Sequence, residues 1–171
     1  MLVLTECTEN DIGAYRNIFV EEYENDLIRN HHLSQSEANK KAIDVFNSSF
    51  SDNQPEKNNS LLRITKKLND EPCHVGYIWL LYSPKEQSAF IMDFYVSQAY
   101  RNKKIGYEAM SYLISMLEHS NMTTIKLRVE PDNQTAIGLY KKVGFDITGI
   151  NMVRKITSTV KGNDILNDRE C

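Results

Sequence analysis

The first half of the chain carries its hydrophobic residues mostly at helical spacing. LVLTE, at positions 2–6, predicts a short strand. Thr8 followed by Asp11 is typical of a helix start, and hydrophobic residues then recur every three or four positions, at Ile12, Tyr15, Phe19 and Tyr23. Ser34 and Glu37 repeat that start signal before a second run with the same spacing. Two amphipathic helices are therefore expected before residue 50.

The spacing becomes strand-like near residue 61. Three runs, LLRITKKL (61–68), HVGYIWLLY (74–82) and SAFIMDFYV (88–96), are rich in β-branched and aromatic residues. Short polar connections, NDEP and SPKEQ, separate them at hairpin-loop lengths. We expect an antiparallel meander of three strands.

The remaining chain alternates between the two periods. A helix is predicted from about residue 105, a strand in TTIKLRVE (123–130), a short helix in NQTAIGLYKKVGF (133–145) and a final hairpin in FDITGINMVRKI (145–156). Because a helix connects strand 88–96 to strand 123–130, these two strands should be parallel. The expected fold is a mixed α/β domain over 1–156, with about seven mostly antiparallel strands, one parallel pair and about four flanking helices. Residues 157–171 form a polar tail.

Composition narrows the classes of function. The chain has 171 residues, 41% of them hydrophobic, and a net charge of -3, which suits a single globular domain and argues against a nucleic-acid partner. Three cysteines without paired spacing argue against a zinc motif or a disulfide framework and favour a cytoplasmic protein without a metal. No apolar run approaches the ~18 residues of a membrane helix, so no membrane partner is expected.

The stretch YRNKKIGYEAM, from Tyr100 to Met110, has the strongest chemical pattern. It joins a strand to a helix, where unpaired amides and the helix dipole favour an anion. Arg101, Lys103 and Lys104 add positive charge, and Gly106 permits close approach of a ligand. These features fit a diphosphate site, although a solvated basic turn explains this stretch alone equally well.

Two motifs together resemble the GCN5-related N-acetyltransferase (GNAT) superfamily. In the first, Arg/Gln-x-x-Gly-x-Gly/Ala, Arg101 and Gly106 match, whereas Lys104 and Asn102 stand where glycine is usual or frequent. The second, Asn-x-x-Ala-x-x-x-Tyr-x-x-x-Gly-Phe, is met in full by Asn133, Ala136, Tyr140, Gly144 and Phe145. The resemblance covers about residues 61–156. As a whole, the chain resembles small uncharacterised bacterial members of the superfamily.

The resemblance implies a role for each matching position. Backbone amides of one loop would hold the acetyl-CoA diphosphate, namely those of Arg101, Asn102, Lys103, Lys104, Ile105, Gly106 and Tyr107. The strand end Phe94, Tyr95 and Val96 would pair with the pantetheine arm. On the later helix, Asn133 and Ala136 would face the pantetheine and Tyr140 would protonate the departing thiolate. The alternative for Tyr140 is a core tyrosine with its hydroxyl at the surface.

The acceptor side has weaker signals. Asp93 interrupts the apolar run FIMDFYV and, by strand alternation, should share a face with Ile91 and Tyr95. It is either a group that binds or deprotonates an amine, or a structural aspartate with a backbone or lysine partner. Glu130 is a second candidate base, although a solvated strand end explains it better.

Two charged groups lie in the predicted helical region. Four acidic residues of the first helix form either an entrance for a cation or a solvated face: Glu21, Glu22, Glu24 and Asp26. His31 and His32 show no partner in the sequence, and we assign them no catalysis.

The sequence thus predicts an enzyme that transfers an acetyl group directly from acetyl-CoA, as co-substrate, to a primary amine. The acceptor would be a small molecule, a polyamine-like compound or a peptide. A non-catalytic CoA-binding or acyl-CoA-binding module is the alternative, because Lys104 stands at a glycine position. A homodimer through the final hairpin is an assembly that this pattern allows.

Overall fold

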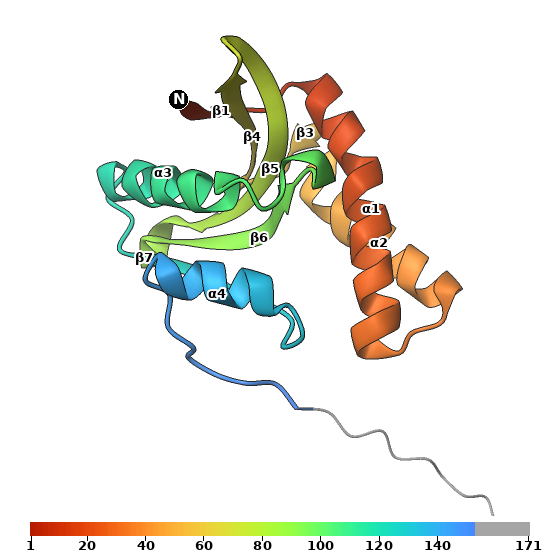
Figure 1. The fold of residues 1–171 in the computed structure, drawn as a ribbon. Coiled ribbons are helices and arrows are strands. Elements are labelled where there is room, and N and C mark those ends of the chain that lie inside the picture. Colours follow the sequence, from red (N-terminus) through yellow and green to blue (C-terminus); the bar gives the residue numbers. More distant parts are fainter. Residues whose placement is uncertain (153–171) are drawn as a thin grey trace, which may run out of the picture.

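The computed structural model describes residues 1–152 (Figure 1). In chain order, its elements are β1 (Leu2–Glu6), α1 (Glu9–His31), α2 (Gln35–Ser49), β2 (Phe50–Ser51), β3 (Gln54–Pro55), β4 (Asn59–Leu68), β5 (Glu71–Ser83), a 3-10 turn (Pro84–Glu86), β6 (Ser88–Val96), a second 3-10 turn (Gln98–Tyr100), α3 (Ile105–His119), β7 (Thr124–Leu127) and α4 (Gln134–Lys142). Both predicted helices of the first half and the three-strand meander are confirmed.

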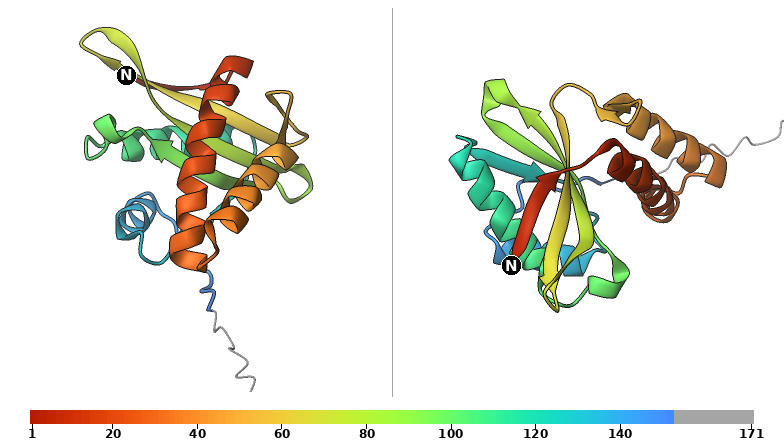
Figure 2. Two further views of the ribbon diagram at one scale, coloured as in Figure 1. Left: turned by 90° about the vertical axis from the view of Figure 1, so that its right-hand side faces the viewer. Right: turned by 90° about the horizontal axis from the view of Figure 1, so that it is seen from above.

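The main sheet has five strands in the order β1-β4-β5-β6-β7, and β2 and β3 form a small separate pair. All pairings in the main sheet are antiparallel except that of β6 with β7, which is parallel as predicted. The mixed α/β class is therefore confirmed, but the main sheet described within residues 1–152 has five strands rather than about seven. Figure 2 shows α1 and α2 together on one side of the sheet and α3 on the other.

Each face of the sheet has its own hydrophobic core. On the α3 side, Ile78, Leu80 and Ile91 pack with the buried face of α3 and with partly buried residues of α4. On the α1 side, an aromatic cluster surrounds Trp79 and includes Tyr15. Neighbouring residues of β5 thus belong to opposite cores, as strand alternation requires.

A bulge in β6 changes which residues share a face. Leu80 pairs with Ile91 but Trp79 pairs with Asp93, so Met92 is an extra residue in β6. Ile91 packs into the α3-side core, whereas Asp93 bonds a tyrosine of the α1-side core. The expectation that Asp93 and Ile91 share a face is therefore wrong, because the bulge resets the alternation between them.

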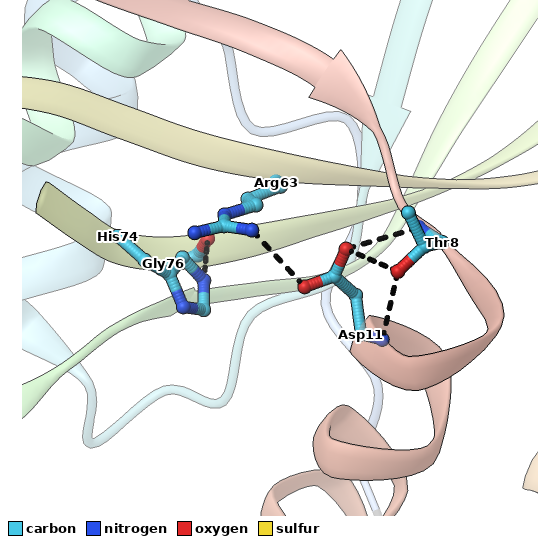
Figure 3. Close-up of polar contacts among 5 residues, drawn as sticks. All are labelled: Thr8, Asp11, Arg63, His74 and Gly76. Atoms are coloured by element: carbon cyan, nitrogen blue, oxygen red, sulfur yellow. Dashed lines mark hydrogen bonds and ion pairs between the residues drawn. The ribbon is translucent and has the colours of Figure 1, made fainter. Parts of the chain in front are cut away.

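Polar contacts fix the start of α1 against the sheet (Figure 3). The Asp11 carboxylate accepts from the backbone and hydroxyl of Thr8, completing a capping box, and pairs with Arg63 on β4 at 3.3 Å. These contacts lower the pKa of Asp11 despite the opposing effect of desolvation. The anchored first turn places Tyr15, one turn later, over the sheet.

Glycine is required where β5 passes the end of β6. Gly76 pairs with Val96, and a Cβ on Gly76 would lie 2.1 Å from the Tyr95 carbonyl oxygen. Any side chain at this position would displace the backbone of β6. Gly76 therefore fixes the path of the three residues that were predicted to face a cofactor.

The predicted final hairpin is not found in the part that the structure describes. Residues 145–152 form no strand, and the rest of the hairpin and the predicted tail at 157–171 lie outside the described residues. Along 1–152, no helix is long and apolar enough to cross a membrane.

Candidate active site

The parallel pairing of β6 and β7 ends before β6 does. It runs from Ser88 paired with Thr124 to Ile91 paired with Leu127. β6 continues to Val96, bound on its other side to β5. From Met92 onward, one edge of β6 therefore has no strand partner among the described residues. Backbone groups along this edge that other contacts leave free can bind a ligand that lies as an added strand.

The loop after β6 contains two residues that stand where the family motif usually or frequently has glycine. Asn102 and Lys104 both have left-handed backbones, with φ of 61° and 62°. Lys104 is the N-cap of α3 and makes no capping hydrogen bond with its side chain. The first amides of α3 consequently keep free donors for an anion. The two residues that replace glycine thus adopt the conformation that glycine favours.

Two basic side chains of this loop donate hydrogen bonds to nearby backbone carbonyls. Arg101 Nε donates to the carbonyl of Val96 at 2.8 Å, and its guanidinium lies 5.7 Å from the Tyr95 ring centre. Lys103 Nζ donates to the carbonyl of Ala99 at 2.9 Å. Arg101 therefore ties the loop to the end of β6 through its Nε.

Gly106 brings three elements of the predicted site together. A Cβ there would lie 3.1 Å from Leu139 Cδ2 on α4 and 3.7 Å from Phe94 Cε1 on β6. The close contact lets the first turn of α3 pack between the strand end and α4. Ile105 beside it is buried, whereas Tyr107 is 48% exposed.

On α4, the residues predicted to contact the cofactor also make structural contacts. Asn133 Oδ1 caps the helix by accepting from the Ala136 amide at 3.1 Å. Tyr140 packs against the α3-side core and meets the Phe145 ring at a centroid distance of 5.7 Å. Burial, followed by the charge of Asp93, raises the pKa of Tyr140 to about 12. Tyr140 and Asp93 are therefore close enough to interact electrostatically.

Asp93 has a partner that the sequence pattern did not indicate. The Tyr15 hydroxyl, on α1, donates to Asp93 Oδ2 at 2.6 Å. Desolvation raises the pKa of Asp93 to about 6, against the lowering effect of hydrogen bonds from Tyr15 and from the Phe94 backbone. Within residues 1–152, no lysine pairs with this carboxylate, and the Phe94 amide is the backbone donor that bonds it, so its pKa of about 6 lies close to physiological pH.

The acidic residues of α1 divide into two groups. Glu22 and Asp26 follow Tyr15 by seven and eleven positions, which places them on the same face of the helix as Tyr15. Their negative charges raise the pKa of Asp93. Glu24 instead accepts from Gln35 and, at 2.6 Å, from Asn39 of α2. The predicted acidic entrance is thus limited to one face of α1, with Glu24 serving helix packing.

Glu130 is not brought to Asp93 by any described contact. Its carboxylate lies 3.3 Å from His31 Nε2 and 3.7 Å from Arg128. His31 therefore has a carboxylate partner, contrary to the sequence expectation, and Glu130 joins the end of α1 to the segment after β7. Because these two partners already engage its carboxylate, Glu130 is a poorer candidate for a base than Asp93.

Comparisons with known proteins agree with this architecture. The acetyltransferase (GNAT) family profile matches residues 16–145, and the chain belongs to this family. The uncharacterised N-acetyltransferase YdgE of Bacillus subtilis (strain 168) is 26% identical over 155 residues, which are 90% of this chain and 97% of YdgE. YycN, an uncharacterised N-acetyltransferase of the same strain, is 34% identical over 92 residues, or 53% of this chain and 58% of YycN.

Two solved structures illustrate the shared fold. The crystal structure of YycN from Bacillus subtilis gives a TM-score of 0.83 at 24% identity and covers 92% of this chain and 100% of that chain. The PaiA N-acetyltransferase of Thermoplasma acidophilum, crystallised with coenzyme A, gives a TM-score of 0.63 at 14% identity, over 88% of this chain and 93% of that chain. These two structures show the shared fold, and the family match together with the named relatives identifies the protein as an acyltransferase.

Replacing Lys104 by glycine should stabilise the protein. The left-handed backbone at Lys104 costs a residue with a side chain about 1 kcal/mol, which glycine avoids. We expect Lys104→Gly to raise the melting temperature by about 2–4 °C in calorimetry. Lys103→Gly is the matched control, because Lys103 has no left-handed backbone; it should bring no gain. A melting temperature that falls in both variants would contradict the strain at Lys104.

Proposed function

We propose that the protein transfers the acetyl group of acetyl-CoA directly to a primary amine. The observation that carries this proposal is the early end of β6–β7 pairing at Ile91 and Leu127. The unpaired strand edge leads straight into the left-handed loop and the start of α3. Acetyl-CoA carries groups that suit these elements in the same order. The amides of its pantetheine arm can pair with a strand edge, and its diphosphate can bind at a helix start.

The residues present fit that ligand. Phe94, Tyr95 and Val96 would offer backbone groups to the pantetheine. Free amides between Arg101 and Tyr107 would hold the diphosphate, with the Lys104 ammonium adding positive charge. Asn133 and Ala136 would border the arm from α4, although the Asn133 oxygen is already engaged in the helix cap. PaiA, crystallised with coenzyme A, supports this use of the fold.

Tyr140 would assist the departure of the thiolate. With its pKa raised to about 12, the phenol stays protonated at neutral pH and can donate to developing negative charge. It is a weaker acid than a thiol of pKa ~8.5, so complete proton transfer to the thiolate is uphill. Hydrogen-bond donation is therefore the larger part of the role that we assign to Tyr140.

Asp93 would receive the amine. At neutral pH a carboxylate of pKa about 6 is mostly ionised, and it attracts an ammonium group. Asp93 would first take one proton from this ammonium, because only the neutral amine has the lone pair that attacks the thioester carbonyl. As the C–N bond forms and the C–S bond breaks, the nitrogen would lose its second proton to the departing thiolate or to solvent. Glu22 and Asp26 add negative potential around Asp93, which favours cationic acceptors over neutral ones. Glu130 remains the weaker candidate for this role.

A covalent enzyme intermediate is disfavoured at Cys7, which packs against the aromatic cluster that includes Tyr15. Burial, followed by the charges of Asp11 and Glu6, raises the pKa of Cys7 to about 12. The thiolate is the nucleophilic form of cysteine, and at neutral pH Cys7 holds almost none. Direct transfer between bound acetyl-CoA and amine fits this chemistry.

The proposal is tested by measuring thermal stabilisation by acetyl-CoA and then thiol release against polyamines, amino acids, aminoglycosides and peptides. Stabilisation with release in the presence of one acceptor class supports the enzyme. Stabilisation without release from any acceptor would favour the non-catalytic binding module, and no stabilisation would refute both.

Tyr140→Phe should lower kcat by about 10–100-fold, below the full range of general acid catalysis, because only a hydrogen bond to the leaving group is lost. The dissociation constant of acetyl-CoA should change little, since the ring remains. Tyr112→Phe on α3, where the side chain is 42% exposed, is the matched control and should keep full activity. An unchanged kcat in purified Tyr140→Phe would remove Tyr140 from this role.

A further inference from the structure

Tyr15 reaches the proposed acceptor side from a different element. It is fully buried on α1, and its hydroxyl gives Asp93 the short 2.6 Å hydrogen bond. Its ring packs against Tyr77 on β5 at a centroid distance of 5.0 Å, within the aromatic cluster. Because packing fixes the ring, the hydroxyl oxygen is held within hydrogen-bond distance of the carboxylate.

We propose that Tyr15 is a positioning residue that orients the Asp93 carboxylate and keeps it ionised. This inference rests on the proposed function, in which the ionised form binds the amine. A donor to a carboxylate stabilises its charged form. Without that donor, only the Phe94 backbone hydrogen bond would still oppose desolvation.

Two charged groups facing Asp93 oppose its ionisation, and a neutral tyrosine also interacts with it. Glu22 and Asp26 on α1 repel the carboxylate, and on α4 the neutral Tyr140 interacts with it. Tyr15 itself is kept protonated, because burial and then the charge of Asp93 raise its pKa well above the ordinary value; Cys7 and Tyr77 act in the same direction. The Tyr15 proton therefore stays on the phenol while Asp93 titrates.

Tyr15→Phe tests this role through the pH profile. In the wild type, the acidic limb of kcat/KM should lie near pH 6, where Asp93 loses its proton. Loss of a hydrogen bond to a charged group should move this limb upward by about 1–2 pH units. Tyr77→Phe, which removes a hydroxyl from the adjoining ring, is the matched control and should leave the limb in place.

A titration of the ¹³C-labelled Asp93 carboxyl by NMR, assigned with Asp93→Asn, makes the test independent of turnover. An upward shift in Tyr15→Phe alone supports the positioning role even if no acceptor is found. An equal midpoint in wild type and Tyr15→Phe would overturn it. If the carboxyl shifts but acetyl transfer is absent from the wild type, only the proposed function fails.

Discussion

The proposed site depends on the two edges of β6, one paired with β5 throughout and the other paired with β7 only as far as Ile91. Up to Ile91 the strand lies between β5 and β7; beyond the bulge at Met92, β5 is its one strand partner within residues 1–152. Gly76 permits the close approach that keeps this end on β5. The same bulge directs Asp93 towards α1 while Phe94 stays with the α3-side core, so one irregularity separates the proposed amine side from the proposed cofactor side.

Much of this fold was predictable because the sequence patterns that specify its helices and strands lie within short segments. Hydrophobic spacing predicted the helices and the meander, and the helix between β6 and β7 required their parallel pairing. The loop from Arg101 to Tyr107 was found through its motif, and the structure explains its departures from glycine by left-handed backbones at Asn102 and Lys104.

Other features depend on contacts between distant positions. Tyr15 and Asp93 are 78 residues apart, and His31 and Glu130 are 99 apart, so no spacing rule connects them. The bulge at Met92 was missed because the run FIMDFYV contains no glycine or other sign of an irregularity. The Asp93 carboxylate in an apolar strand was the sequence feature that indicated a distant contact, because a buried charge requires a partner.

The central claim is that the free edge of β6 binds the pantetheine arm of acetyl-CoA, and amide hydrogen exchange measures this directly. On addition of acetyl-CoA, amides between Met92 and Val96 that face away from β5 should become protected, together with those between Asn102 and Tyr107. Amides of β1, at the opposite edge of the sheet, should exchange as before. Saturating acetyl-CoA that leaves the β6 amides unprotected would contradict the account.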